Sequence, residues 1–438
     1  MTSLVLANKN IVVVGLGLTG QSCLRFLSAK GANLVAMDSR ESLNIELDVP
    51  VILGELDIKL LLNADLVVVS PGVNLNTPVF KQVIEAGVKV IGDIEIFAQF
   101  NTKPVIAITG SNGKTTVTHL VAAMCKQAGK KVLMGGNVGV PVLDLLDQDA
   151  DIFVLELSSF QLDTTYSLQP LVATVLNVSE DHLDRHGDLF SYQQAKLKIF
   201  DNAQVSVINR DDALAHPIDE SKITEALTFG LSASEQGFSW DPEKQHILLD
   251  GQSFLSSQKC LLVGQHNMLN IQAAAALALS AGIDQASIKL AATEFNGLPH
   301  RCQTVSVHNN VRWINDSKAT NVGATLAAIY GLRASIQGKL ILIAGGDGKG
   351  ADFSPLAEVL QNSVEVLITF GRDGHQIAAL KEGTFQVNNL TEAVQLAAQH
   401  VAVNDVVLLS PACASLDMFT NYQERGECFA QAVKELAA

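Results

Sequence analysis

The stretch ITGSNGKTT, residues 108–116, follows the apolar run VIAI and leads into a helical pattern that begins at Lys114. Its end matches the phosphate-binding pattern G-x-x-x-x-G-K-[ST], but Ile108 stands where the outer glycine is expected, and the nearest glycine is Gly110. The backbone N–H groups of such a turn and the lysine ammonium can still surround a polyphosphate. The stretch therefore predicts a phosphate-binding loop between a strand and a helix, with a chance turn as the alternative.

Apolar runs on both sides of this loop predict an α/β fold with parallel sheets. IVVVG, LVAMD, DLVVVS and VKVIGD alternate with helical stretches at the start of the chain. After Pro104 the runs VIAITG, KVLMGG, DIFVLE, ATVLNV and VSVINR form a second series. Residues 231–263 favour short antiparallel strands, and an alanine-rich helix is expected over residues 267–281.

Beyond the turn NGLPHR, the runs VRWIND, KLILIAGG, EVLITFG and DVVLLSP predict a third α/β unit. Functional groups are expected in the loops at the carboxyl ends of these strands. We expect three domains, at residues 1–93, 94–297 and 298–438.

Composition narrows the functional classes. The chain has 438 residues, of which 48% are hydrophobic and 17% charged, and its net charge of −15 argues against a nucleic-acid partner. No apolar run approaches the roughly eighteen residues that a membrane helix needs, and MTSLVLANKN does not resemble a secretory signal. We therefore expect a cytoplasmic protein without membrane insertion. Its six scattered cysteines form no metal-binding spacing.

The glycine-rich turn GLGLTG, residues 15–20, follows the first strand and opens a helix, and Asp38 ends the next strand. Glycines allow close approach to a pyrophosphate, and an acid at this interval can bind ribose hydroxyls. The pattern favours a nucleotide diphosphate without specifying NAD, and a purely structural turn is the alternative.

Polar residues close two strands of the second series. A carboxylate at Glu156, after an apolar run, is costly to bury unless it has a partner or a cation, so it is a candidate Mg²⁺ ligand. A helix-capping or ion-paired acid is the alternative. His182 ends the cluster NVSEDH and is either a further ligand or a solvated loop histidine.

Later clusters are ambiguous one by one. A helix N-cap is enough to explain Asn267. The clusters HR, NDSK, GGDGK and SPACAS, which begin at residues 300, 315, 345 and 410, are as typical of turns as of sites. Together, their lysines on loops next to apolar strands favour an anionic second substrate.

Taken in order, GLGLTG, SPGV, TGSNGKTT, LELSSFQL, LNVSEDHLDRHG, GQHN, LPHR, NDSKATN, GGDGK and SPACASLD resemble the motifs of the Mur ligase family over essentially the whole chain. The resemblance implies a Rossmann-like N-terminal domain that holds a UDP-linked substrate, a P-loop-type central ATPase domain and an α/β C-terminal domain that closes over ATP. It implies a monomeric ligase of peptidoglycan precursor synthesis. The implied reaction adds D-glutamate to UDP-N-acetylmuramoyl-L-alanine through an acyl phosphate, with ATP as cosubstrate and two Mg²⁺ ions.

The resemblance also assigns roles to individual residues. The implied ATP contacts are Gly110, Ser111, Asn112, Gly113, Lys114, Thr115, Thr116, Asn267, Asn270, Arg301 and Asp316. The implied contacts of the UDP-linked substrate are Leu16, Thr19, Asp38, Ser70, Gly72, Asn137, Ser158 and Gln161. The implied D-glutamate contacts are Lys318, Thr320, Lys349, Ser415 and Tyr422, where the family pattern has phenylalanine at the last position.

The implied metal ligands are Thr115, Glu156, His182 and Lys196, the last as a carbamate formed with CO₂. The implied catalytic residues are Lys114, His182, Lys196 and Asp316, and the general base is not assigned between His182 and Asp316. Without the resemblance, Lys196 would be taken for an exposed helix lysine.

Other functions predict other patterns. A folylpolyglutamate synthase would not need the first 93 residues, and the muramyl ligases that add a diamino acid carry an Asp-Asn-Pro-Arg motif that this chain lacks. A nicotinamide-dependent oxidoreductase would leave the second phosphate loop without a task. A non-catalytic nucleotide-dependent scaffold would hydrolyse no ATP with any acceptor.

Overall fold

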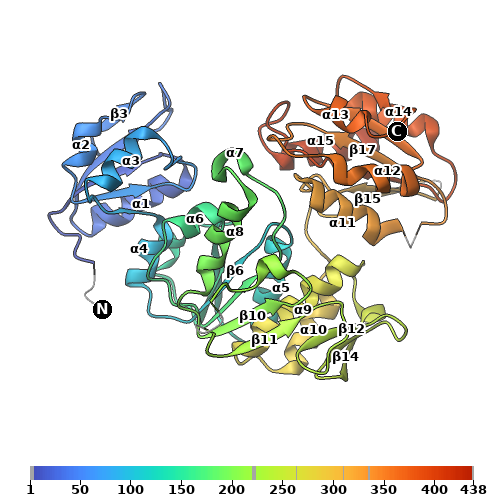
Figure 1. The fold of residues 1–438 in the computed structure, drawn as a ribbon, viewed down its shortest axis with the longest axis horizontal. Coiled ribbons are helices and arrows are strands. Elements are labelled where there is room, and N and C mark those ends of the chain that lie inside the picture. The colour runs from blue at the N-terminus through green and yellow to red at the C-terminus, as the bar shows by residue number, and fades with distance from the viewer. Residues whose placement is uncertain (1–3, 220–222, 263, 309, 334–335, 437–438) are drawn as a thin grey trace.

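The computed structural model describes residues 4–219, 223–262, 264–308, 310–333 and 336–436. The three α/β units form a bent arrangement, with the central unit at the bend between the N-terminal unit and the C-terminal unit (Figure 1). Each is built on a mainly parallel sheet whose central strands are buried on both faces. The predicted fold class, three α/β units with parallel sheets, is confirmed.

The N-terminal sheet has the strand order β3-β2-β1-β4-β5, and all of its pairs are parallel. Its strands are β1 Asn10–Val14, β2 Asn33–Asp38, β3 Val51–Leu53, β4 Leu66–Val69 and β5 Val90–Ile91. The helices around it are α1 Leu18–Ala29, α2 Ile58–Leu62 and α3 Pro78–Glu85, and α4 Asp93–Phe100 leads into the central unit.

The central sheet has the order β11-β10-β9-β6-β8-β7, again all parallel. Its strands are β6 Val105–Thr109, β7 Val132–Gly136, β8 Ile152–Glu156, β9 Val172–Val175, β10 Val205–Asn209 and β11 Ala226–Phe229. The helical elements of this unit are α5 Lys114–Gln127, η1 Val142–Leu145, α6 Ser159–Asp163, α7 Leu183–His186, α8 Leu189–Leu197, η2 Lys198–Phe200, η3 Ala213–Ala215, η5 Ser257–Lys259, α9 Gln265–Ser280 and α10 Gln285–Glu294.

A small antiparallel sheet completes the central unit, as residues 231–263 predict. It consists of β12 Phe238–Asp241, β13 His246–Leu249 and β14 Gln252–Ser256. Its side chains Phe238, Ile247 and Phe254 join the apolar cluster beneath α5 and α9.

The C-terminal sheet has the order β15-β16-β20-β17-β18-β19, with only β15 antiparallel. Its strands are β15 Gln303–His308, β16 Val311–Asn315, β17 Leu340–Gly345, β18 Val366–Phe370, β19 Phe385–Gln386 and β20 Val406–Leu409. Its helical elements are α11 Val322–Arg333, η6 Ser354–Leu356, α12 Ala357–Ser363, α13 Gly374–Ala378, α14 Leu390–His400 and α15 Tyr422–Glu435.

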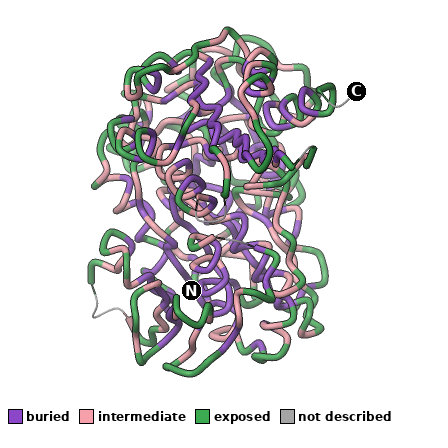
Figure 2. The backbone as a smooth tube through the Cα atoms, turned by 90° about the vertical axis from the view of Figure 1, so that its right-hand side faces the viewer, coloured by how far each residue is buried: buried purple, intermediate pink, exposed green. Residues whose placement is uncertain are grey.

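The buried side chains divide unevenly among the units. One apolar cluster runs without a break from the N-terminal unit, at residues such as Leu27 and Phe97, into the central unit at Phe153 and Leu162. The C-terminal sheet has apolar clusters of its own on its two faces. Buried backbone follows the interior of the units, and exposed backbone their outer loops (Figure 2). No helix in the described part of the chain is long and apolar enough to cross a membrane.

Candidate active site

The loop at residues 110–113 lies at the carboxyl end of β6, where the central sheet meets α5. Ile108 is fully buried and pairs with Glu156 and Thr174 on the two neighbouring strands, so the strand still continues where a common phosphate loop would have begun. Gly113 has φ 84° and precedes Lys114, the first residue of α5. A Cβ on Gly113 would lie 2.5 Å from Oδ1 of Asn270, so only glycine fits there. The predicted strand, loop and helix are confirmed.

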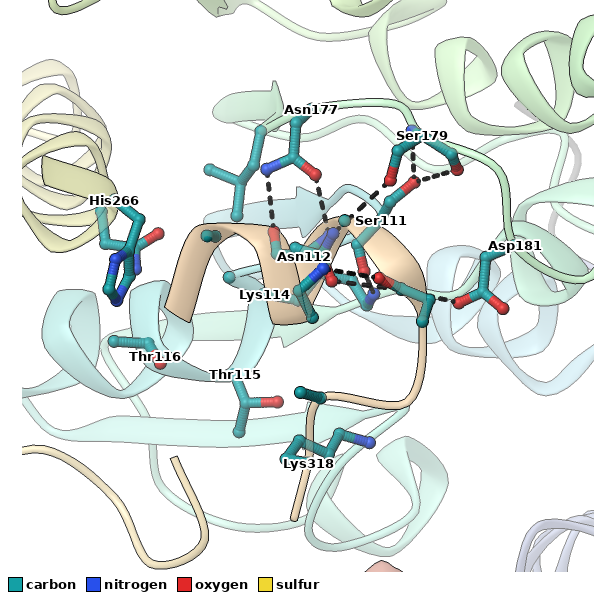
Figure 3. Close-up of a pocket in the computed structure, with 18 of the residues that line it drawn as sticks. Ser111, Asn112, Lys114, Thr115, Thr116, Asn177, Ser179, Asp181, His266 and Lys318 are labelled. Atoms are coloured by element: carbon teal, nitrogen blue, oxygen red, sulfur yellow. Dashed lines mark hydrogen bonds between the residues drawn. The ribbon is translucent and has the colours of Figure 1, made fainter. Parts of the chain in front are cut away.

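The segment after β9 holds this loop in place. Asn177 accepts from the Asn112 N–H at 2.8 Å and donates from its side chain to the Asn112 carbonyl at 3.1 Å. The hydroxyl of Ser111 accepts from the Ser179 N–H at 2.9 Å and donates to the Ser179 carbonyl at 3.0 Å. These reciprocal bonds surround the loop in Figure 3 and fix its backbone before any ligand binds.

Lys114 turns its ammonium into the loop. Its Nζ donates to the carbonyls of Gly110 at 2.7 Å and Ser111 at 3.0 Å. Burial lowers the pKa of Lys114, and the nearby acids Glu156 and Asp181 only partly oppose that effect. A half-buried cation without an ion pair among the described residues is suited to bind a phosphate oxygen.

Glu156 lies at the end of β8 with 2% of its surface exposed. Its Oε1 accepts from the Asn137 side chain at 2.8 Å, and its buried Oε2 has no hydrogen-bond partner among the described residues. The helix-capping alternative is wrong, because the Ser158 side chain caps α6. An unpartnered carboxylate oxygen in the cavity that Thr115 also lines is a fitting donor for Mg²⁺. Within the described residues, no three His, Cys, Asp or Glu side chains form a metal cluster by themselves.

His182 precedes α7 and has the left-handed φ of 55°, which is uncommon for a residue other than glycine. Burial lowers its pKa to about 4, so the ring is neutral near pH 7. Its ring meets the Phe160 ring edge-on at 5.1 Å. A neutral imidazole in this position can accept a proton or ligate a cation.

Lys196 corrects one expectation from the sequence. It is 1% exposed on α8, so the alternative of an exposed helix lysine is wrong. Its Nζ donates to the Gly110 carbonyl at 3.0 Å and lies 4.3 Å from the centre of the Tyr192 ring. Burial, followed by the charge of Lys114, lowers the pKa of Lys196 well below its ordinary value. A lowered pKa favours the neutral amine, which is the form that reacts with CO₂.

Polar side chains from the C-terminal unit line the opposite wall. The cavity that the loop faces has a volume of about 620 Å³. The C-terminal residues that line it include Arg301, Asp316, Lys318 and Thr320. Burial raises the pKa of Asp316 to about 6, although the carboxylate accepts from the Cys302 N–H and the Ser410 hydroxyl. Lys318 is labelled in Figure 3, and burial lowers its pKa to about 8.

Asn267 and Asn270 also line the cavity. The N-cap interpretation of Asn267 is wrong, because Gly264 caps α9 and Asn267 lies in the first helical turn. Asn270 donates from its side chain to Oδ1 of Asn267 at 3.1 Å, so the two amides form one polar group next to Gly113.

The residues expected to contact the UDP-linked substrate divide between two places. Asn137 and Ser158 line the central cavity. The other six expected contacts do not line it: Leu16, Thr19, Asp38, Ser70, Gly72 and Gln161. Asp38 already accepts two bonds from the Arg40 guanidinium and one from the Leu16 N–H, and these hold its pKa well below the usual range.

Among the remaining residues expected at the D-glutamate site, Lys349 lies at the seam between the C-terminal and central units. Lys349 donates to Asp181 at 2.5 Å across that seam. The Lys318 ammonium lies 4.2 Å from the centre of the Tyr422 ring, and Ser415 is buried. The hydroxyl of Tyr422 does not prevent its ring from packing against a cation.

Sequence reasoning missed two groups. Asn321 donates from its side chain to Asn112 and Asp181, both at 3.2 Å, and so ties the C-terminal unit to the loop. Arg425 is fully buried and donates to the Ser317 carbonyl at 2.7 Å and the Cys413 carbonyl at 3.1 Å. Asp181 and Asn321 lie in the motifs LNVSEDHLDRHG and NDSKATN, so their place after a strand could have marked them as site residues. The helical pattern around Arg425 contains no signal that this side chain is buried.

A phosphate loop, a buried carboxylate and cations from a second α/β unit around one cavity define a class of nucleotide-dependent transferase or ligase. Three family models match the chain: "Mur ligase MurD-like, N-terminal domain" at residues 9–92, "Mur ligase middle domain" at 108–278 and "Mur ligase, glutamate ligase domain" at 300–413. The chain belongs to the Mur ligase family, whose members are ATP-dependent enzymes that form amide bonds.

Individual relatives agree with this assignment. The chain is 48% identical over 434 residues to the UDP-N-acetylmuramoylalanine--D-glutamate ligase of Escherichia coli (strain K12), covering 98% of each protein. It is 47% identical over 426 residues to the enzyme of the same name from Haemophilus influenzae (strain 86-028NP), covering 96% of this chain and 97% of that protein.

Solved structures show the same fold. UDP-N-acetylmuramate-alanine ligase MurC from Thermotoga maritima superposes with a TM-score of 0.62 at 19% identity, covering 98% of this chain and all of that chain (100%). MurF from Acinetobacter baumannii superposes with a TM-score of 0.64 at 17% identity, covering 98% of this chain and 91% of that one.

Proposed function

We propose that this enzyme uses ATP to join D-glutamate to UDP-N-acetylmuramoyl-L-alanine in peptidoglycan precursor synthesis. One observation carries the proposal. The tight phosphate loop with Lys114, the Glu156 carboxylate and the C-terminal cation Lys318 face one cavity, and Oε2 of Glu156 has no hydrogen-bond partner among the described residues. Curated relatives of nearly equal length are named for this reaction.

The first step is the activation of a carboxylate. An oxygen of the L-alanine carboxylate attacks the γ-phosphorus of ATP, its bond to the β-γ bridging oxygen breaks, and ADP leaves while an acyl phosphate forms. We assign Gly110, Ser111, Asn112, Gly113, Thr115 and Thr116 to the phosphates through the loop. Lys114 reduces the repulsion between the reacting anions, which is the main obstacle to this step.

We assign Mg²⁺, as two ions, to Thr115, Glu156, His182 and a carbamate on Lys196. The unpartnered Oε2 of Glu156 and the buried, unusually acidic ammonium of Lys196 support this assignment. When bound, Mg²⁺ supplies positive charge to the phosphate oxygens.

The second step forms the amide. The D-glutamate amine attacks the acyl carbon, a tetrahedral intermediate forms, and inorganic phosphate leaves as the carbonyl is restored. His182 and Asp316 are the candidate acceptors of the amine proton. Asp316 is the stronger base of the two, because its pKa is raised to about 6 while that of His182 is lowered to about 4.

We assign the D-glutamate carboxylates to Lys318 and Lys349, with Thr320, Ser415 and Tyr422 around them. The Lys349 ammonium already bonds to Asp181, so the incoming carboxylate competes with that side chain for the same cation. Asn267, Asn270, Arg301 and Asp316 are assigned to the nucleoside part of ATP, and Leu16, Thr19, Asp38, Ser70, Gly72, Asn137, Ser158 and Gln161 to the UDP-linked substrate.

Three further expectations belong to the proposal. Domain boundaries near residues 93 and 297 are supported by the strands, because the first sheet ends at Ile91 and the third begins at Gln303. A monomer is proposed, since each polar wall of the cavity comes from the same chain. A cytoplasmic location is proposed because that is where ATP and UDP-linked precursors are available.

Product analysis tests the proposed function. Purified enzyme is mixed with ATP, UDP-N-acetylmuramoyl-L-alanine and either D- or L-glutamate, and the products are identified by mass spectrometry. We expect ADP, phosphate and the amide product with D-glutamate only. Amide formation without ADP release, or ADP release that no glutamate isomer stimulates, would contradict the proposal.

A further inference from the structure

Arg185 connects two units that are distant along the chain. It lies on α7 of the central unit, and its guanidinium donates to two main-chain carbonyls of the N-terminal unit, those of Gly72 at 3.0 Å and Val73 at 2.9 Å. The Asn76 side chain donates back to the Arg185 carbonyl at 3.1 Å. Three hydrogen bonds therefore cross the seam at a single residue of the central unit.

The Arg185 guanidinium packs against a group of aromatic rings. Its central carbon lies 4.6 Å from the centre of the Phe160 ring. Phe160 stacks on the His186 ring, with centroids 5.1 Å apart and planes at 4°, and meets His182 edge-on. His186 in turn lies 2.9 Å from the Ser159 hydroxyl. The same ring thus touches Arg185 on one side and the candidate metal ligand His182 on another.

The segment at residues 70–73, which Arg185 contacts, supports the glycine-rich turn at residues 15–20. The Ser70 hydroxyl donates to the Gly15 carbonyl at 2.7 Å. A Cβ on Gly15 would lie only 2.9 Å from both the Ser70 Cβ and a Val73 methyl group. The turn at residues 15–20 and the segment at residues 70–73 are therefore packed too tightly to shift independently.

We propose that Arg185 is a positioning residue: it holds residues 70–73, and through them the turn at residues 15–20, in fixed relation to the phosphoryl-transfer centre beside His182. The inference rests on the proposed function for what this turn binds. A substrate anchored in the N-terminal unit has to present its carboxylate at the loop of the central unit, so a small displacement of the turn misplaces the reacting atom.

A second contact across the same seam provides a matched control. Arg25 on α1 pairs with Asp144 of η1 at 2.7 Å, and the Ser22 hydroxyl bonds to the same carboxylate at 2.8 Å. Arg25→Ala removes a guanidinium from the seam, as Arg185→Ala does, but it breaks no bond to residues 70–76.

Amide hydrogen exchange on the unliganded full chain tests the contact without any reaction. Arg185→Ala should speed exchange at residues 70–76 by about fivefold or more, with no change at residues 105–109 of β6. Arg25→Ala should leave residues 70–76 unchanged. Asn76→Ala removes the return bond from the other side and should speed the same amides, which keeps the test open if Arg185→Ala folds poorly. Equal exchange at residues 70–76 in all variants and in the wild type would overturn the proposal.

Kinetics test the consequence. Arg185→Ala should lower kcat/KM for UDP-N-acetylmuramoyl-L-alanine about tenfold or more, while the KM for ATP stays within about twofold. Arg185→Lys, which can still donate to one carbonyl, should recover part of the loss. A loss no larger than that of Arg25→Ala, or equal increases in KM for both substrates, would overturn the positioning role. If the wild type does not use this substrate, the proposed function fails, whereas the exchange experiment still decides the contact.

Discussion

At the scale of single residues, half-buried positive charge is the main feature of the cavity. Lys114, Arg301 and Lys318 line it, and burial lowers the pKa of each. Since desolvation disfavours a cation, a polyanion that binds here gains more from these side chains than it would from exposed ones. The cavity is therefore prepared for phosphates and carboxylates.

Lys114 should be essential for phosphoryl transfer. Lys114→Ala removes the ammonium that the loop carries at its centre, and we expect kcat to fall by ~10³-fold or more, with little change in folding. The measurement is ADP release with all substrates present. Lys126→Ala, at the exposed end of the same helix, is the control and should keep wild-type rates. Near-native turnover by Lys114→Ala would remove the loop from the mechanism.

Lys318 should make D-glutamate binding sensitive to alkaline pH. Its pKa is lowered to about 8, so the cation is present below that pH and is lost above it. The KM for D-glutamate should rise above pH 8, by up to about tenfold per pH unit. Lys318→Arg stays charged and should flatten this rise. A wild-type KM that is constant from pH 7 to 9 would contradict the assigned role.

Lys196 should carry a carbamate under CO₂. Its amine is buried against the Gly110 carbonyl and the Tyr192 ring, and the lowered pKa of Lys196 favours the neutral form that this adduct needs. Carbon NMR with ¹³C-bicarbonate should show a carbamate resonance that is missing in Lys196→Ala. Lys198→Ala, two residues along the chain and ion-paired with Asp163, should keep the signal. A resonance of equal intensity in all three proteins, or none in the wild type, would reject the adduct.

At the scale of elements, close backbone contacts position the carboxyl ends of the central strands. Gly136 ends β7 with φ 100°, and a Cβ there would lie 2.2 Å from the Glu156 carbonyl oxygen. The Asn137 N–H donates to that same oxygen at 2.7 Å. The glycine is thus what allows β7 to bring Asn137 against Glu156.

Gly136→Ala should therefore be more harmful than an ordinary glycine replacement. We expect a loss of at least ~3 kcal/mol in the free energy of unfolding, from backbone strain plus steric overlap. Gly129→Ala is the matched control, because Gly129 also has a positive φ but has open space around its missing Cβ, and it should cost only ~1 kcal/mol. Urea unfolding followed by circular dichroism measures both. Equal losses for the two variants would show that the contact with Glu156 is unimportant.

Elements also show where sequence reasoning worked and where it failed. Central parallel strands such as β6 and β17 are fully buried, and their apolar runs predicted them. The edge strands β3, β15 and β19 were missed, because each is short or largely exposed: β3 has three residues, β19 has two, and no residue of β15 is buried. Their pairing depends on the neighbouring strand rather than on their own pattern.

The same distinction holds for the site. Loops at strand ends were predictable, so the groups around Lys114 and Glu156 were found from local pattern. The burial of Lys196 and the bonds of Asn321 depend on residues far away in the chain, 86 and 209 positions respectively. Local sequence contains no signal for such contacts, and family resemblance alone drew attention to Lys196.

At the scale of the whole molecule, the three units are joined unequally. The N-terminal and central units share one apolar cluster, whereas the C-terminal unit has its own clusters. The C-terminal unit makes polar bonds to the central unit, from Asn321 to Asn112 of the loop and from Lys349 to Asp181. Polar contacts of this kind break and re-form more easily than a packed core. The C-terminal unit is therefore the part best suited to open for substrates and close over them.

The central claim is that the loop delivers the γ-phosphoryl group of ATP to the substrate carboxylate. The most direct measurement uses UDP-N-acetylmuramoyl-L-alanine with ¹⁸O in its L-alanine carboxylate, together with ATP and D-glutamate, and examines the released phosphate by ³¹P NMR. An acyl phosphate transfers one carboxylate oxygen to phosphate, so we predict one ¹⁸O atom in each inorganic phosphate formed. Phosphate without ¹⁸O, released alongside the amide product, would contradict the account.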